Sequence, residues 1–123
     1  MWRLVRQLGI LTVLLTSSLH AKAQMELITI EHPFHARSLA GIVVDPSGGT
    51  VPGVVIEDCD STFKQVLDST TTDANGHFIF PHAKAGTTHF LRVSHYGFDP
   101  MQITVELGHF AKGGLTIRLY IAT

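Results

Sequence analysis

Histidine is the residue type whose abundance first suggests chemistry in this 123-residue chain. A zinc or copper site needs two to four imidazoles that converge at about 2 Å from one ion. Seven of the eight histidines lie beyond residue 23, namely His32, His35, His77, His82, His89, His95 and His109. Pro33 opposes a helical presentation of the closest pair, and a strand would separate His89 from His95 by about 20 Å. The spacing therefore predicts no metal site.

Acidic residues gather at Glu57, Asp58 and Asp60, where carboxylate oxygens could act as hard ligands for calcium. The twelve-residue calcium loop with its terminal glutamate is missing from this segment, however. We therefore expect residues 58–61 to form a solvated loop and to hold no ion.

Nucleophilic catalysis finds no support in the residues around the hydroxyl and thiol groups. Ser47 stands in a Pro-Ser-Gly-Gly turn and lacks the Gly-x-Ser-x-Gly elbow of hydrolases. Cys59 has acids on both sides, which raise a thiol pKa and make the thiol a poor nucleophile. We expect no catalytic residue, no cofactor and no enzyme activity.

Cys59 is also the only cysteine, so no intrachain disulfide can form. Two alternatives remain for its thiol. It is a small buried hydrophobic group, which is the favoured interpretation, or it pairs with a cysteine of another chain in an oxidising compartment.

The first 23 residues have the pattern of a cleaved signal peptide. Arg3 and Arg6 supply a basic start, residues 8–15 are apolar, and Ala-Lys-Ala at 21–23 precedes a cut at Gln24. The apolar run is shorter than the roughly 20 residues that cross a bilayer, which disfavours the alternative of an uncleaved anchor. We expect a periplasmic or secreted protein with no stable membrane span after processing.

The charge of the processed chain restricts its partners. Residues 24–123 contain six Lys and Arg against ten Asp and Glu, a formal charge of −4, with no basic run. Such a surface attracts neither nucleic acid nor anionic lipid. We expect the partner to be another envelope or secreted protein, with carbohydrate as the alternative.

Short apolar segments separated by turns at intervals of 8–12 residues predict an all-β sandwich or barrel. Residues 63–67 fit either a strand or a short helical turn. Alternation places Phe78 with Phe80 on one face, and it places Leu115 to Ile121 in phase at every second residue. The expected strands are residues 39–44, 54–56, 70–72, 77–80, 89–96, 101–107 and 115–121.

Three segments in this order resemble the carboxypeptidase regulatory-like domain, a transthyretin-like β-sandwich. Residues 41–56 (GIVVDPSGGTVPGVVI) are similar to its opening hairpin, residues 72–80 (TDANGHFIF) to its second motif, and residues 91–98 (LRVSHYGF) to its third. His89 departs from the tyrosine common at that position. The likeness covers residues 38–121.

The resemblance implies a seven-stranded antiparallel Greek-key β-sandwich (transthyretin/prealbumin-like) at residues 38–123, after a signal peptide at 1–23 and an extended leader at 24–37. The leader is either a first strand or a connecting segment. The residues that the resemblance assigns to structural turns are Gly41, Asp45, Gly48, Gly53, Asp73, Gly76 and Gly97.

Two functions follow from this sequence. The first is a non-catalytic exported module for protein interaction or structural support at the cell envelope. The second is a carbohydrate-binding module, in which an exposed Phe90 and Tyr96 would stack on sugar rings. A transthyretin-like hydrolase is rejected, because the chain ends in Tyr120-Ile121-Ala122-Thr123 and lacks that enzyme's terminal motif.

Overall fold

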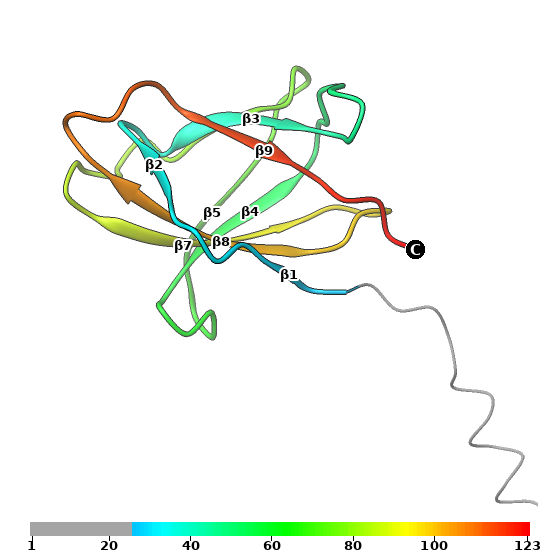
Figure 1. The fold of residues 1–123 in the computed structure, drawn as a ribbon, viewed down its shortest axis with the longest axis horizontal. Coiled ribbons are helices and arrows are strands. Elements are labelled where there is room, and N and C mark those ends of the chain that lie inside the picture. The colour runs from blue at the N-terminus through cyan, green and yellow to red at the C-terminus, as the bar shows by residue number, and fades with distance from the viewer. Residues whose placement is uncertain (1–25) are drawn as a thin grey trace, which may run out of the picture.

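The computed structural model describes residues 26–123, which fold into strands and loops without a helix (Figure 1). The strands are short, and polar or glycine-containing turns separate them. In chain order they are β1 (Ile28–Thr29), β2 (Phe34–Ala36), β3 (Ala40–Val44), β4 (Val55–Cys59), β5 (Val66–Thr71), β6 (His77–Ile79), β7 (Thr88–Ser94), β8 (Met101–Leu107) and β9 (Leu115–Arg118).

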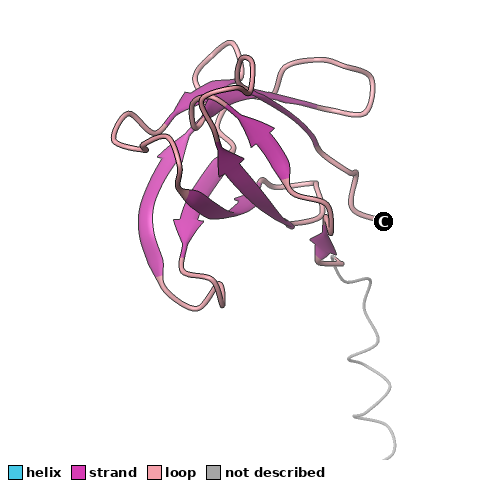
Figure 2. Cartoon of the chain, turned by 60° about the vertical axis from the view of Figure 1, so that its left-hand side comes forward, coloured by secondary structure: helices cyan, strands magenta, loops and turns pink. Residues whose placement is uncertain are grey.

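Two sheets enclose the core, as the rotated view in Figure 2 shows. Neighbouring strands of the large sheet follow the order β1-β8-β7-β4-β5. Strand β2 also pairs with β8, further along that strand than β1 does. The small sheet runs in the order β6-β3-β9. The all-β sandwich that the sequence predicts is therefore confirmed.

Two details of the predicted sandwich differ from the structure. Strands β3 to β9 account for the seven expected strands, and the leader adds two more, which brings the number in residues 26–123 to nine. The sheets are also mixed, because β1 and β2 pair with β8 in parallel and β3 pairs with β9 in parallel. Pro33 lies between β1 and β2, where it cannot donate to the ladder, so the leader is one edge strand in two pieces.

The leader belongs to the packed domain. Its Ala36 is fully buried, and Ile28, Ile30 and Phe34 pack against the core. Ile28 and Ile30 donate backbone hydrogen bonds to Pro100 and Gln102 at the edge of the large sheet. Of the two alternatives for the leader, the structure therefore shows a strand and not a connecting segment.

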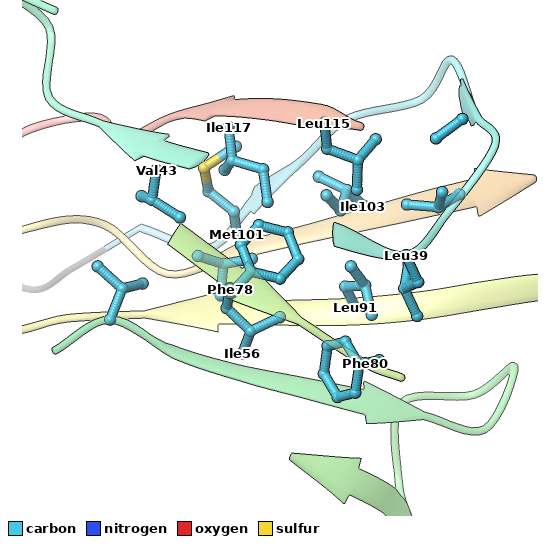
Figure 3. Close-up of a cluster of buried hydrophobic side chains, with 14 of the residues drawn as sticks. Leu39, Val43, Ile56, Phe78, Phe80, Leu91, Met101, Ile103, Leu115 and Ile117 are labelled. Atoms are coloured by element: carbon cyan, nitrogen blue, oxygen red, sulfur yellow. The ribbon is translucent and has the colours of Figure 1, made fainter. Parts of the chain in front are cut away.

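Alternating apolar residues from both sheets fill the space between them (Figure 3). Phe78 and Phe80 point inward from the segment around β6, with ring centroids 6.4 Å apart. Ile56, Leu91 and Ile103 meet them from three neighbouring strands of the large sheet. Burial of these side chains is the main favourable contribution to folding, at about 25 cal/mol for each Å² of apolar surface.

The last predicted strand is shorter than its sequence pattern suggests. Leu115, Ile117 and Leu119 are buried, but β9 ends at Arg118 and Ile121 is 60% exposed. Ile121 instead forms an isolated bridge with Phe98, so its side chain does not join those of Leu115, Ile117 and Leu119 in the core. Residues 63–65 form a turn and loop, and the strand of this region begins at Val66.

The predicted signal peptide lies outside the described residues. Within residues 26–123 the structure contains no helix with the length and hydropathy needed to cross a bilayer.

Candidate functional site

Three aspartates organise three similar loops at strand ends. The Asp45 carboxylate accepts hydrogen bonds from the N–H groups of Ser47 and Gly49, and the Asp73 carboxylate accepts from those of Asn75 and His77. The Asp60 carboxylate accepts from the N–H groups of Thr62 and Lys64 in the same i+2 and i+4 pattern. Each carboxylate therefore takes the place of a missing backbone partner in a tight turn.

Asp60 was not predicted as a structural turn residue, although the residues after it show the same pattern as those after Asp45 and Asp73. Asp45, Asp60 and Asp73 are each followed two residues later by Ser, Thr or Asn. The Ser47 hydroxyl bonded to Asp45 and the Thr62 hydroxyl bonded to Asp60 lower the pKa of these two carboxyls. The N–H of His77 lowers the pKa of Asp73 most.

The glycines of the predicted turns serve two different purposes. Gly48, Gly53, Gly76 and Gly97 all have positive φ. Gly76 is the most constrained of them, because a Cβ would lie 2.9 Å from Cβ of Thr50. Gly41 is not in a turn at all, since it lies within β3, where a Cβ would overlap the backbone oxygen of Leu115 on β9.

Thr72, the first residue of the second motif, closes a buried gap between strands. Its hydroxyl donates to the Val51 carbonyl oxygen and accepts from the Val54 N–H, both at 2.8 Å. Without this hydroxyl both backbone groups would lose their partner in the interior. The Thr-Asp pair of the motif is therefore structural at both positions.

The acidic cluster suggested by the sequence does not form, because its members lie on different surfaces. Glu57 points to the outer face of the large sheet and pairs with Arg92 at 2.8 Å. Asp58 is buried within β4 and bonds to His89, whereas Asp60 is used in its own loop. The predicted solvated loop at 58–61 is thus wrong for Asp58 and Cys59, which belong to the strand.

Cys59 is 2% exposed, is not part of the core cluster and is the register partner of Phe90 on β7. The Phe63 ring of the 60–65 loop packs edge-on against Phe90, with centroids 6.0 Å apart, and the Phe63 carbonyl accepts from Arg92. Burial raises the pKa of the Cys59 thiol, opposed by Arg92 and assisted by the neighbouring acids. Desolvation is therefore a larger cause of the raised pKa than the acids named from the sequence.

The histidines do not converge in the described part of the chain. Residues 26–123 hold no group of three or more His, Cys, Asp or Glu side chains placed to share a metal ion. His35 lies near Glu106, His89 bonds to Asp58, and His95 packs on Phe98. These histidines thus have separate neighbours in separate places.

A shallow hollow of about 640 Å³ lies over the small sheet. We call it the small-sheet hollow. It is lined by Ser38, Ala40, Gly41, Ile42, Thr70, Thr71, Asp73, His77, Phe78, Ile79, Gly114, Leu115 and Thr116. Small residues form much of it, because Gly41 and Gly114 lie where the backbones of β3 and β9 approach each other closely. Ile79 is a large apolar side chain at this hollow and is 58% exposed.

A second hollow, of about 500 Å³, adjoins Tyr96, and we call it the Tyr96 hollow. It is lined by Gly53, Val55, Ser94, His95, Tyr96, Phe98 and Pro100. Tyr96 is 91% exposed in the turn after β7. The structure does not bring Phe90 to this place, because Phe90 packs on Phe63 and is not among the residues that line the Tyr96 hollow.

The fold, its aspartate-held turns and its apolar filling define a small β-sandwich domain in which the motif residues are structural. The profile of one family, the carboxypeptidase regulatory-like domain, matches residues 38–120. The chain belongs to this family, whose domains are non-catalytic β-sandwich modules. No curated protein matches the chain as a relative.

Proposed function

We propose that this chain is exported and serves as a protein-interaction or structural module at the cell envelope or outside the cell. The proposal for export comes from the signal-peptide pattern of residues 1–23. The proposal for interaction rests on the family and on the surface of the small sheet. The partner would be another envelope or secreted protein.

The observation that carries this proposal is the small-sheet hollow. A contact surface of this kind needs apolar groups free of internal partners and a shape that admits another chain. Ile79 supplies the exposed apolar side chain, and Ala40 and Gly41 leave room beside it. Asp73 and His77 border the hollow with polar groups, as expected for the rim of an interface.

A matched pair of substitutions tests this surface. Ile79→Asp places a charge at the hollow, whereas Leu67→Asp places one on β5 at a side chain of similar exposure, 63% against 58%. Affinity capture from the cell envelope should recover the same partner with the wild type and Leu67→Asp, and lose it with Ile79→Asp. Equal recovery by all three proteins would contradict an interface at this hollow.

Carbohydrate binding remains a second candidate because of the Tyr96 hollow. An almost fully exposed tyrosine beside Val55, Phe98 and Pro100 offers the apolar surface on which a pyranose ring can stack. If sugar binds here, Tyr96→Ala should abolish retention on a polysaccharide column and Tyr120→Ala, at another exposed tyrosine, should not. Failure of the wild-type protein to bind an array of glycans would remove this candidate.

A further inference from the structure

A chain of hydrogen bonds joins three segments at one end of the sandwich. Nδ1 of His89 lies 2.8 Å from Oδ2 of Asp58, and Nε2 of His89 lies 2.8 Å from Oγ1 of Thr87. The Thr87 hydroxyl in turn donates to the carbonyl oxygen of Lys84. The chain therefore links β4, β7 and the connection between β6 and β7.

The Asp58–His89 pair belongs to the inner face of the large sheet. Asp58 is the register partner of Leu91, which is fully buried, and His89 precedes Leu91 by two residues on the same side of β7. The two side chains are only 12% and 15% exposed. The Asp58–His89 bond is therefore partly shielded from water, whereas the two bonds of Thr87 are exposed. The number of protons decides which of the three bonds can form together.

Counting donors and acceptors gives the number of protons that the three contacts need. The Lys84 carbonyl can only accept, so the single hydroxyl proton of Thr87 is committed to it. The contact between Thr87 and His89 then needs a proton on Nε2, and the contact with an ionised Asp58 needs one on Nδ1. All three hydrogen bonds can form together only when the pair holds one extra proton. The count is relative to an ionised Asp58 and a neutral His89.

The geometry points to a proton-dependent latch, in which the Asp58–His89 pair fastens the connection between β6 and β7 while it holds this extra proton and frees the Lys84 carbonyl when the proton leaves. After the loss, Nε2 of His89 becomes an acceptor and Thr87 turns its hydroxyl toward it. Nδ1 keeps its proton toward Asp58. The carbonyl of Lys84 is then left to water.

Other charges near His89 do not enter the chain of bonds. Arg92 on β7 pairs with Glu57 on the outer face, and Glu106 on β8 lies beside His35. The register partner of His89 on β8 is Val105, which carries no charge. In the connection, His82 and Lys84 are exposed, and neither makes an ion pair within residues 26–123.

The part of the connection that the latch controls is short. Gly86 donates to Leu107, and Thr87 accepts from Leu107, so these two residues stay tied to β8 in either state. The segment from His82 to Ala85 has the Lys84 carbonyl bond and a long contact from Ala83 to Phe80, at 3.4 Å. We therefore expect release to raise the mobility of residues 82–85 and to leave the sheets intact.

Hydrogen exchange with matched variants tests the latch. Protection of the Ala83 amide, which donates to the Phe80 carbonyl, should fall, after correction for intrinsic exchange at each pH, as a rising pH removes the extra proton. One net hydrogen bond supports a change of about fivefold. Thr87→Val should remove this dependence, and Thr88→Val, at the next residue, should keep it. A wild type with flat protection, or a Thr87→Val variant with the wild-type profile, would overturn the latch.

Nitrogen-15 NMR of the imidazole gives a second test that needs only the wild-type protein. At low pH both ring nitrogens of His89 should show the shifts of protonated atoms, and Nε2 should be the first of them to lose its proton as the pH rises. A single protonated nitrogen throughout, or loss of the Nδ1 proton first, contradicts the count on which the latch rests.

Discussion

At the scale of single residues, polar side chains act in this domain mainly by satisfying its own backbone. Thr72 bridges two buried backbone groups, and Arg92 holds both Glu57 and the carbonyl of Phe63. Thr72 lies in a motif that carries the family resemblance, but the sequence assigned it no role. Its two partners, Val51 and Val54, lie 21 and 18 residues earlier in the chain, and only the fold brings them together.

Replacing Thr72 with valine tests this role at nearly constant volume. The change leaves the Val54 N–H and the Val51 carbonyl without a buried partner, so we expect a loss of about 1–3 kcal/mol in the free energy of unfolding. Urea denaturation measures this loss. Thr71→Val, at an exposed neighbouring position, is the control and should stay within about 0.5 kcal/mol of the wild type.

At the scale of elements, turns and strand contacts decide which residues the fold requires. The apolar alternation around β6, β7 and β8 was readable from the sequence, because each strand has one face in the core. Parallel pairing of β3 with β9 was not readable, since it joins residues more than 70 positions apart. The place of Gly41 beside β9 followed from the same pairing and was equally hidden.

Gly41→Ala tests this close contact of strands. Because the new methyl group would overlap the Leu115 carbonyl, β3 and β9 must move apart. We expect a loss of about 1–3 kcal/mol, the usual cost of forcing extra volume into a packed interior. Thermal unfolding followed by circular dichroism measures it. At Gly108 a Cβ meets nothing, so Gly108→Ala should have a much smaller effect.

The aspartate loops predict how stability changes in acid. The pKa values of Asp45, Asp60 and Asp73 are lowered in the folded chain by hydrogen bonds to the carboxylates. Folding therefore favours the charged form, so their contribution is complete above the unfolded value of 3.8 and is lost as the pH falls through the folded values.

Measured free energies of unfolding should thus decrease as the pH is lowered below about 4. Asp73→Asn keeps an oxygen that accepts hydrogen bonds but cannot lose a proton, so its stability should fall less steeply than that of the wild type. An identical slope for the two proteins would show that the Asp73 loop does not contribute to this dependence.

At the scale of the whole molecule, the sequence predicted the class of fold better than the place of function. Alternating apolar residues and turn residues predicted a sandwich. In the structure the leader forms an edge of the large sheet beside β8. The hollows could not be predicted, because they depend on residues from separate strands, such as Ala40, Ile79 and Thr116 in one of them. Both described chain ends meet near the 97–100 turn, where Asp99 bonds to Glu26 and Tyr120 (Figure 1).

Export is the whole-molecule prediction that a mass measurement can decide. The protein recovered from the periplasm or medium should begin at Gln24, because the Ala-Lys-Ala sequence at 21–23 fits signal peptidase. Intact mass spectrometry of that fraction gives the answer. A protein that retains residues 1–23 would exclude cleavage and support the anchor alternative.

The most direct test of the central proposal is photocrosslinking in living cells through the small-sheet hollow. A photoreactive amino acid at position 79, in place of Ile79, should form a covalent adduct with one envelope or secreted protein. The same group in place of Leu67, on exposed β5, should form none with that protein. Equal adducts from both positions, or no adduct from position 79 in cells that contain the exported protein, would contradict an interaction surface on the small sheet.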